Sequence, residues 1–181
     1  MNGVPEREHG FPPSAGPEEG DIEGFALLER TAVRRSVPEF EWRRFTTASS
    51  RHRLTMPLSD ATVGLISTSG ARVARQPSFD VASDEGDPSW RVIPADTPTH
   101  RLRFNHAGYD VRNAYADPDC VFPLSLLRRY ADERRIGAVA ARAYSLMGYI
   151  TQTDVLLEET GPAIAAAMAA DGVDLAFLVP A

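Results

Sequence analysis

The sequence predicts an α/β fold with an open parallel sheet of the Rossmann or flavodoxin-like type. Short apolar runs at residues 62–68, 136–141 and 173–179 predict three buried strands. Segments with helical periodicity lie between them, at about residues 123–137 and 154–171. The order strand–helix–strand–helix–strand implies parallel pairing through right-handed crossovers.

The segment between the first strand and the first helix predicts turns and one long loop. The first strand runs into Ser69-Gly70, which favours a turn. Backbone N–H groups there could hold an anion, but a single Gly matches neither a dinucleotide fingerprint nor a P-loop, so an ordinary turn is favoured. Residues 76–99, rich in Pro, Asp and Ser, predict a long loop, and residues 101–104 alternate like a strand with one exposed face.

The two predicted helices have recognisable end signals. Pro123 suits the first helical position, where its missing N–H costs nothing, and Gly137 closes that helix. In the second helix, Gly161-Pro162 is expected to produce a break or a kink. Gly172 suits the C-terminal cap, and the last strand follows directly.

Composition divides the chain into three parts. Residues 1–24 carry six acidic residues and one Arg, and with their Gly and Pro content they predict a disordered acidic tail. Residues 25–59 have apolar residues without a clean period, which indicates an N-terminal arm. Residues 60–181 form the predicted α/β domain, and 181 residues in all suit one domain of ordinary size.

Several classes of function are excluded by composition. The 19 basic residues are all Arg, so a Lys Schiff base and a P-loop Lys are ruled out. A net charge of −6 without a basic field argues against nucleic-acid binding, and the apolar runs are too short to span a bilayer. One Cys and four His provide too few ligands for a structural zinc site, and a lone Cys fits the reducing cytoplasm.

Two groups of side chains are candidates for a site. His106, Tyr109 and Asp110 lie within five residues and could supply a proton donor, an orienting group and a charge partner. The favoured alternative is a polar turn in which Asp110 caps the local backbone. Cys120 precedes a predicted helix start, where a thiolate is favoured, although the favoured alternative is a buried structural Cys. Residues 143–147 fail the nucleophile-elbow pattern, so a serine hydrolase is not expected.

The end of the last predicted strand bears on where a catalytic residue is expected. In open α/β sheets, catalytic groups gather just beyond the carboxyl ends of the strands. Here only Pro180 and Ala181 follow that strand. We therefore expect a reactive residue just after Ala181, no catalytic nucleophile within the chain, and a sheet that is incomplete at its C-terminal side.

From about Ala61 onward the chain resembles the selenoprotein B family of D-proline reductase and glycine/sarcosine/betaine reductase. The proline reductase branch shares the His-x-Gly-Tyr-Asp of residues 106–110 and the Glu-Thr-Gly-Pro of residues 159–162. The residues before about position 55 do not match well. The other matching stretches are residues 63–70, 91–94, 119–123, 147–149 and 171–174.

This resemblance implies an oxidoreductase subunit that reductively cleaves a C–N bond at the α-carbon of an amino acid or derivative. In the family, selenocysteine or Cys follows the equivalent of the last strand, so the sequence would end immediately before the nucleophile. The implied partners are a subunit with a pyruvoyl group, which holds the substrate, and a dithiol or thioredoxin-like reductant that becomes a disulfide. The chain as given should be inactive alone.

Two readings stay open on the sequence. One is this selenol- or thiol-dependent reductase subunit, present in part, with His106, Tyr109, Asp110 and more remotely Cys120 lining its site. The other is a non-catalytic α/β binding or interaction module that uses the loops of residues 76–120. Proline, glycine, sarcosine and betaine are not distinguished as substrates.

Overall fold

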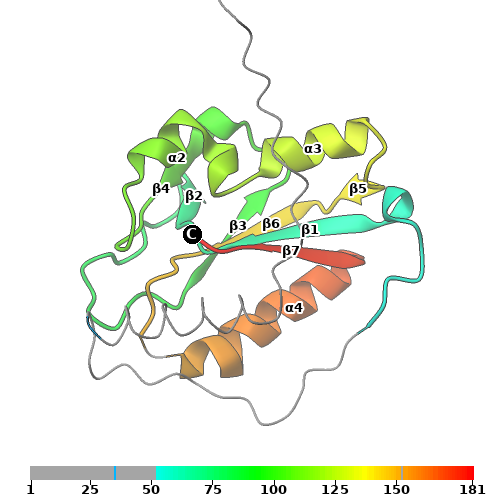
Figure 1. Ribbon diagram of the computed structural model, residues 1–181. Coiled ribbons are helices and arrows are strands. Elements are labelled where there is room, and N and C mark those ends of the chain that lie inside the picture. The colour runs from blue at the N-terminus through cyan, green and yellow to red at the C-terminus, as the bar shows by residue number, and fades with distance from the viewer. Residues whose placement is uncertain (1–34, 36–51, 152) are drawn as a thin grey trace, which may run out of the picture. The chain divides into compact units, whose positions relative to one another are not determined.

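The computed structural model describes residue 35, residues 52–151 and residues 153–181 (Figure 1). The chain divides into two compact units, Met1–Arg51 and His52–Ala181. The predicted tail, and the predicted arm apart from residues 35 and 52–59, lie outside the described residues. Every strand described here belongs to the second unit.

The second unit is organised around one strand. β1 (Thr62–Ser67) is parallel to β7 (Leu175–Val179) along one edge. Its other edge is parallel first to β5 (Ala138–Val139) and then to β6 (Arg142–Leu146). β3 (Trp90–Pro94) adds to the outer edge of β6 in the antiparallel direction. The predicted α/β fold is confirmed, but the sheet is mixed rather than wholly parallel.

Alternate residues of β1 face two separate cores. Val63 and Leu65 pack with Leu124 and Leu127 of α3 (Leu124–Asp132), whereas Ile66 packs with the α4 side. α2 (Arg112–Ala116) and α3 cover one face of the sheet, and α4 (Gly161–Ala170) covers the other (Figure 1). The chain therefore crosses from β1 to β6 over one face and from β6 to β7 over the opposite face.

Two strand predictions need correction. The predicted long loop of residues 76–99 contains β3, an edge strand that ends on Pro94, a position where a missing N–H is tolerated. The strand predicted at residues 136–141 ends too early, because the extended segment continues into β6 as far as Leu146. Arg142 opens β6 and interrupts the apolar run, which hid the buried residues after it.

A small antiparallel sheet pairs β2 (Ala71–Val73) with β4 (Leu102–Phe104). The alternation predicted for residues 101–104 is confirmed, because Leu102 and Phe104 are buried while Arg103 between them is exposed. Short 3-10 turns precede β1, β4 and α3. They are η1 (Leu58–Asp60), η2 (Thr99–Arg101) and η3 (Pro118–Cys120).

The helix between β6 and β7 changes its winding where a break was expected. Its first part, η4 (Leu156–Thr160), is a π-helix, and α4 begins at Gly161. Pro162 has no backbone N–H, so it cannot donate a helical hydrogen bond. The wider π-helical turn just before Pro162 accommodates this residue, and the helix continues. Gly172 has φ +69°, and Val173 N donates to Met168 O, which confirms the predicted C-terminal cap.

β7 lies at the edge of the sheet and is exposed. It was predicted as a buried strand, and this is wrong for the described residues: Leu178 is 65% exposed and Phe177 is 42% exposed. Among these residues only β1 pairs with β7, so its second edge has no strand beside it. A run of apolar residues predicts burial, but a strand with one neighbour has a free edge and an open flank.

Candidate functional site

The place beyond the carboxyl ends of β1 and β6, where the loops after these strands meet, is called the crevice below. The two strands are neighbours, and their outgoing connections leave toward opposite faces of the sheet, which makes this a topological switch point. The loops meet there: Gly148 N donates to Thr68 O at 2.9 Å, and Ser69 forms a bridge with Met147. In open α/β sheets this is the place where ligands bind.

His106 lies at this crevice, brought there by the loop that follows β4. Its Nε2 accepts a hydrogen bond from Gly148 N at 3.1 Å, and its Nδ1 accepts one from Gly108 N at 2.8 Å. Burial lowers the pKa of His106, an effect that the hydrogen bond with Thr68 opposes.

Tyr109 supports the imidazole from one side. The centres of the two rings are 4.5 Å apart, and the Tyr109 hydroxyl donates to Ser69 O at 2.8 Å. Burial raises the pKa of Tyr109 to about 12, with smaller contributions from Cys120 and Tyr115. The phenol therefore keeps its proton at neutral pH and ties the His106 loop to the turn after β1.

Asp110 does not join this pair. It is exposed, its carboxylate is hydrogen-bonded to the Arg112 guanidinium, and Oδ1 accepts from Arg112 N at 3.0 Å. These hydrogen bonds hold the pKa of Asp110 below its ordinary value. The alternative in which Asp110 caps the local backbone is confirmed.

Cys120 is exposed, so the favoured expectation of a buried structural Cys is wrong. The apolar neighbour Phe122 is the residue that enters the core, with 0% exposure. Cys120 also does not occupy the start of α3, because the Asp119 carboxylate accepts the hydrogen bonds of Ser125 N and Ser125 Oγ there. Cys120 is the last residue of η3, which precedes α3.

The turn after β1 offers no free cradle for an anion. Thr68 N donates to Val179 O, Ser69 N to Ser67 Oγ and Gly70 N to Leu146 O. Gly70 has φ +66°, as a tight turn requires. The ordinary turn favoured by the sequence is therefore confirmed.

Ala181 lies in the same crevice. Its backbone nitrogen donates to Thr68 Oγ1 at 2.9 Å. A Cβ added to Gly148 would lie 3.0 Å from His106 Nε2 and 3.1 Å from Ala181 O, so the Gly makes room for both. The residues that lead out of β7 thus approach the same Gly that His106 contacts.

Thr68 and Gly148 were not predicted as site residues. Thr68 closes the first predicted strand, so its position was available from the sequence. Gly148 was hidden because the second strand was expected to end at residue 141 instead of Leu146. Correct strand ends would have placed both residues at the switch point.

The arrangement places the His106 imidazole and the Thr68 hydroxyl beyond the carboxyl ends of β1 and β6. Within the described ranges, no group of three or more His, Cys, Asp or Glu residues could hold a metal ion. No helix in the described part of the chain has the length and apolar character needed to cross a membrane.

Comparison with known proteins gives two curated relatives. D-proline reductase subunit gamma of Acetoanaerobium sticklandii is 35% identical over 125 residues, which are 69% of this chain and 50% of that protein. The betaine reductase complex component B subunit beta of Peptoclostridium acidaminophilum is 28% identical over 139 residues, 72% of this chain and 31% of that protein. The chain therefore spans half or less of the relatives it matches. No solved structure matches it significantly.

The model of the family described as glycine/sarcosine/betaine reductase selenoprotein B matches residues 38–181. The match begins earlier than the sequence stretches suggested, since residues before about 55 were expected to fit poorly. It includes β1, the His106 loop, β6 and β7, and so every element around the crevice. The chain belongs to the glycine/sarcosine/betaine reductase selenoprotein B family.

Proposed function

We propose that the chain is the front part of a reductase subunit whose nucleophile, selenocysteine or Cys, directly follows Ala181. The reaction is reductive cleavage of a C–N bond at the α-carbon of an amino acid or derivative, as in D-proline or glycine/sarcosine/betaine reduction. The observation that carries the proposal is the position of Ala181, which is hydrogen-bonded to Thr68 and lies beside Gly148, the residue that also contacts His106. The relatives are subunits of reductases of this kind.

The residues around Ala181 fit a selenol or thiol at this place. The bond from Ala181 N to Thr68 Oγ1 fixes the backbone that leads to the next residue. A selenol is ionised at neutral pH, whereas an ordinary thiol with a pKa of about 8.5 is mostly protonated, so selenium supplies a ready nucleophile.

His106 is our candidate proton donor. Its pKa is lowered, so the ring is neutral near pH 7 and can take up a proton from solvent. As the C–N bond breaks, the imidazolium so formed passes this proton to the leaving nitrogen and returns to the neutral ring. Tyr109 and Thr68 are positioning residues, because they act through His106 and through the backbone of Ala181.

Two further components complete the proposed reaction. A pyruvoyl group on a partner subunit holds the substrate, which makes the complex, and not this chain alone, the active species. The two electrons come from a dithiol or a thioredoxin-like reductant, which is oxidised to a disulfide while the α-carbon gains a hydrogen. Such a dithiol is kept reduced in the cytoplasm, which is the proposed location.

The exposed side of β7 supports a longer polypeptide. An apolar groove of about 530 Å³ runs between α4 and the sheet, and β7 contributes Leu178 to it. The connection from β6 to β7 passes over the face that α4 covers. A further parallel strand beyond β7 would continue in the same direction across the sheet, so its right-handed connection would lie on that face too. Its helix would cover the groove, in line with relatives at least twice as long as the matched part.

The gene sequence and the mass of the native protein test the proposal. We expect an in-frame UGA codon after the Ala181 codon, followed by coding sequence for a nearby Cys and a helix, and an intact mass above that of 181 residues. A UAA or UAG codon with no downstream frame, together with a native mass of 19.8 kDa, would refute it and favour a non-catalytic interaction module.

Activity of the complete complex tests the role of His106. His106→Gln is expected to lower kcat about 100-fold with little change in KM, the usual size of a general acid–base contribution. His100→Gln is the matched control, since His100 is exposed and lies in η2, away from the crevice. Equal kcat values for the two variants would show that His106 takes no part in the mechanism. The proposed reductase reaction would not be affected by that result.

A further inference from the structure

Four Arg side chains gather on the small sheet of β2 and β4. Arg72 and Arg103 are directly opposite each other in the antiparallel pairing, and Arg75 and Arg101 follow just outside the paired residues. Like charges opposite each other destabilise a sheet. Arg72 and Arg103 donate hydrogen bonds to neutral oxygens. Within the described residues none of the four forms an ion pair with a carboxylate.

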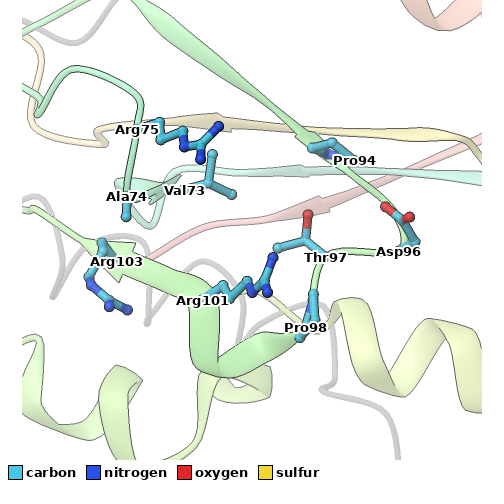
Figure 2. Close-up of a pocket in the computed structure, with 9 residues that line it drawn as sticks. All are labelled: Val73, Ala74, Arg75, Pro94, Asp96, Thr97, Pro98, Arg101 and Arg103. Atoms are coloured by element: carbon cyan, nitrogen blue, oxygen red, sulfur yellow. The ribbon is translucent and has the colours of Figure 1, made fainter.

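Three of these four residues line a cavity of about 590 Å³ (Figure 2). That volume is within the range of small-molecule sites. The guanidinium groups of Arg75 and Arg101 extend into the cavity in this view, whereas Arg103 turns away and donates to the carbonyls of His100 and Leu102. The single acidic residue of the lining is Asp96. The other lining residues are Val73, Ala74, Pro94, Thr97 and Pro98.

This cavity is separate from the crevice at His106. Pro94 of its lining pairs with Arg142 at the start of β6, while Trp90 pairs with Leu146 at the end of β6 beside the crevice. Four residues of extended strand correspond to about 13 Å. The two places also share no lining residue.

We propose that this cavity binds a small organic carboxylate through the guanidinium groups of Arg75 and Arg101. A guanidinium presents paired N–H donors that match the two oxygens of a carboxylate, and among the described residues neither Arg forms an ion pair, although Asp96 lines the same cavity. The apolar walls suit a ligand with a hydrocarbon body, whereas a strongly hydrated inorganic anion gains nothing from them. The inference does not rest on the proposed reductase activity.

Calorimetric titration of the purified full chain with butyrate, succinate and inorganic phosphate tests the proposal. Saturable binding is expected for the two carboxylates, weaker at high ionic strength. Arg75→Gln and Arg101→Gln should each weaken it about tenfold, the effect of losing one charge-assisted hydrogen-bonding group. Arg129→Gln removes the same charge from α3, where Arg129 pairs with Glu133, and should leave binding unchanged.

The result is decisive in each direction. Loss of carboxylate binding in the two pocket variants, with unchanged melting temperatures and an unaffected Arg129→Gln control, supports the site. Absence of saturable carboxylate binding to the wild-type chain overturns it. Equal weakening in all three variants reduces the effect to net charge, and phosphate binding as tight as that of succinate shows that the ligand class is wrong.

Discussion

Nε2 of His106 lies 3.1 Å from the backbone nitrogen of Gly148, so the loop after β4 and the loop after β6 meet at one point. Gly148 N also donates to Thr68 O, which brings in the loop after β1. Three loops distant in sequence thus fix the position of one imidazole. The absence of a side chain at residue 148 is what permits this approach.

Replacing Gly148 by Ala should disturb the crevice. The new Cβ would lie 3.0 Å from His106 Nε2 and from Thr68 Cβ, closer than ordinary contact, so one of them must move. We expect a stability loss of about 1–3 kcal/mol by overpacking, measured by urea unfolding, and a loss of activity in the complete complex. Gly172→Ala is the comparison: nothing lies within 4 Å of its Cβ, and its φ of +69° makes it costly to stability alone. Full activity of Gly148→Ala would show that His106 is not held in a required position.

The partial burial of His106 predicts a pH dependence of stability. Its pKa in the folded chain is lowered from 6.5, so the unfolded chain binds the proton more readily. The free energy of unfolding should therefore fall as the pH drops below about 6.5 and level off below the folded pKa. His106→Gln should flatten this part of the profile, measured by urea unfolding between pH 7.5 and about 4.5. An unchanged slope in the variant, matching that of His100→Gln, would contradict it.

The Tyr109 hydroxyl predicts a loss of stability at alkaline pH. Its pKa is about 12 in the folded chain against 10.0 for an ordinary Tyr, so the unfolded chain loses the proton first and stability falls as the pH rises above 10. Tyr109→Phe removes this dependence and also costs about 1 kcal/mol near neutral pH, because Ser69 O loses its hydrogen bond. Tyr149→Phe, at a residue that is 45% exposed, is the matched control for thermal melts at several pH values.

The ion pair of Arg142 and Asp171 predicts a loss of stability at acid pH. Arg142 Nη2 and Nε lie 2.6 and 2.7 Å from the Asp171 carboxylate, and the Tyr144 hydroxyl donates to it at 3.2 Å. The hydrogen bonds from Arg142 hold the pKa of Asp171 below 3.8. This contribution is present above that pH and is lost as the pH falls through the folded pKa. Asp171→Asn should lower the melting temperature at pH 7, and this effect should shrink as the pH is lowered below 3.8, whereas exposed Asp132→Asn should change the melting temperature little throughout.

Periodicity predicted the central architecture because the residues concerned are buried in regular positions. β1, α3 and the C-terminal cap at Gly172 follow from local patterns that tertiary packing reinforces. β6 was cut short since Arg142 is a polar residue whose charge is compensated by Asp171, 29 positions away in sequence. No local sequence pattern predicts such a distant partner.

The candidate site was predictable in its residue types and not in its geometry. His106 and Tyr109 were singled out by sequence, and the structure brings them together. Thr68 and Gly148 contribute mainly backbone groups and space, which have no signature in a single sequence. The catalytic role of His106 stays a prediction.

Substitution of Leu178 tests whether β7 is exposed or covered in a longer polypeptide. It is 65% exposed in the 181-residue chain, so Leu178→Ser should change the free energy of unfolding of that chain by less than about 0.5 kcal/mol. In a longer subunit whose added polypeptide covers β7, the same substitution removes a buried side chain and should cost about 2 kcal/mol or more. Buried Leu127→Ser on α3 should be strongly destabilising in both polypeptides, because that residue is 5% exposed. Urea unfolding of the four variants measures the difference. An equally small effect of Leu178→Ser in both lengths would mean that the added residues leave β7 uncovered, and the proposed extension of the sheet would then be wrong.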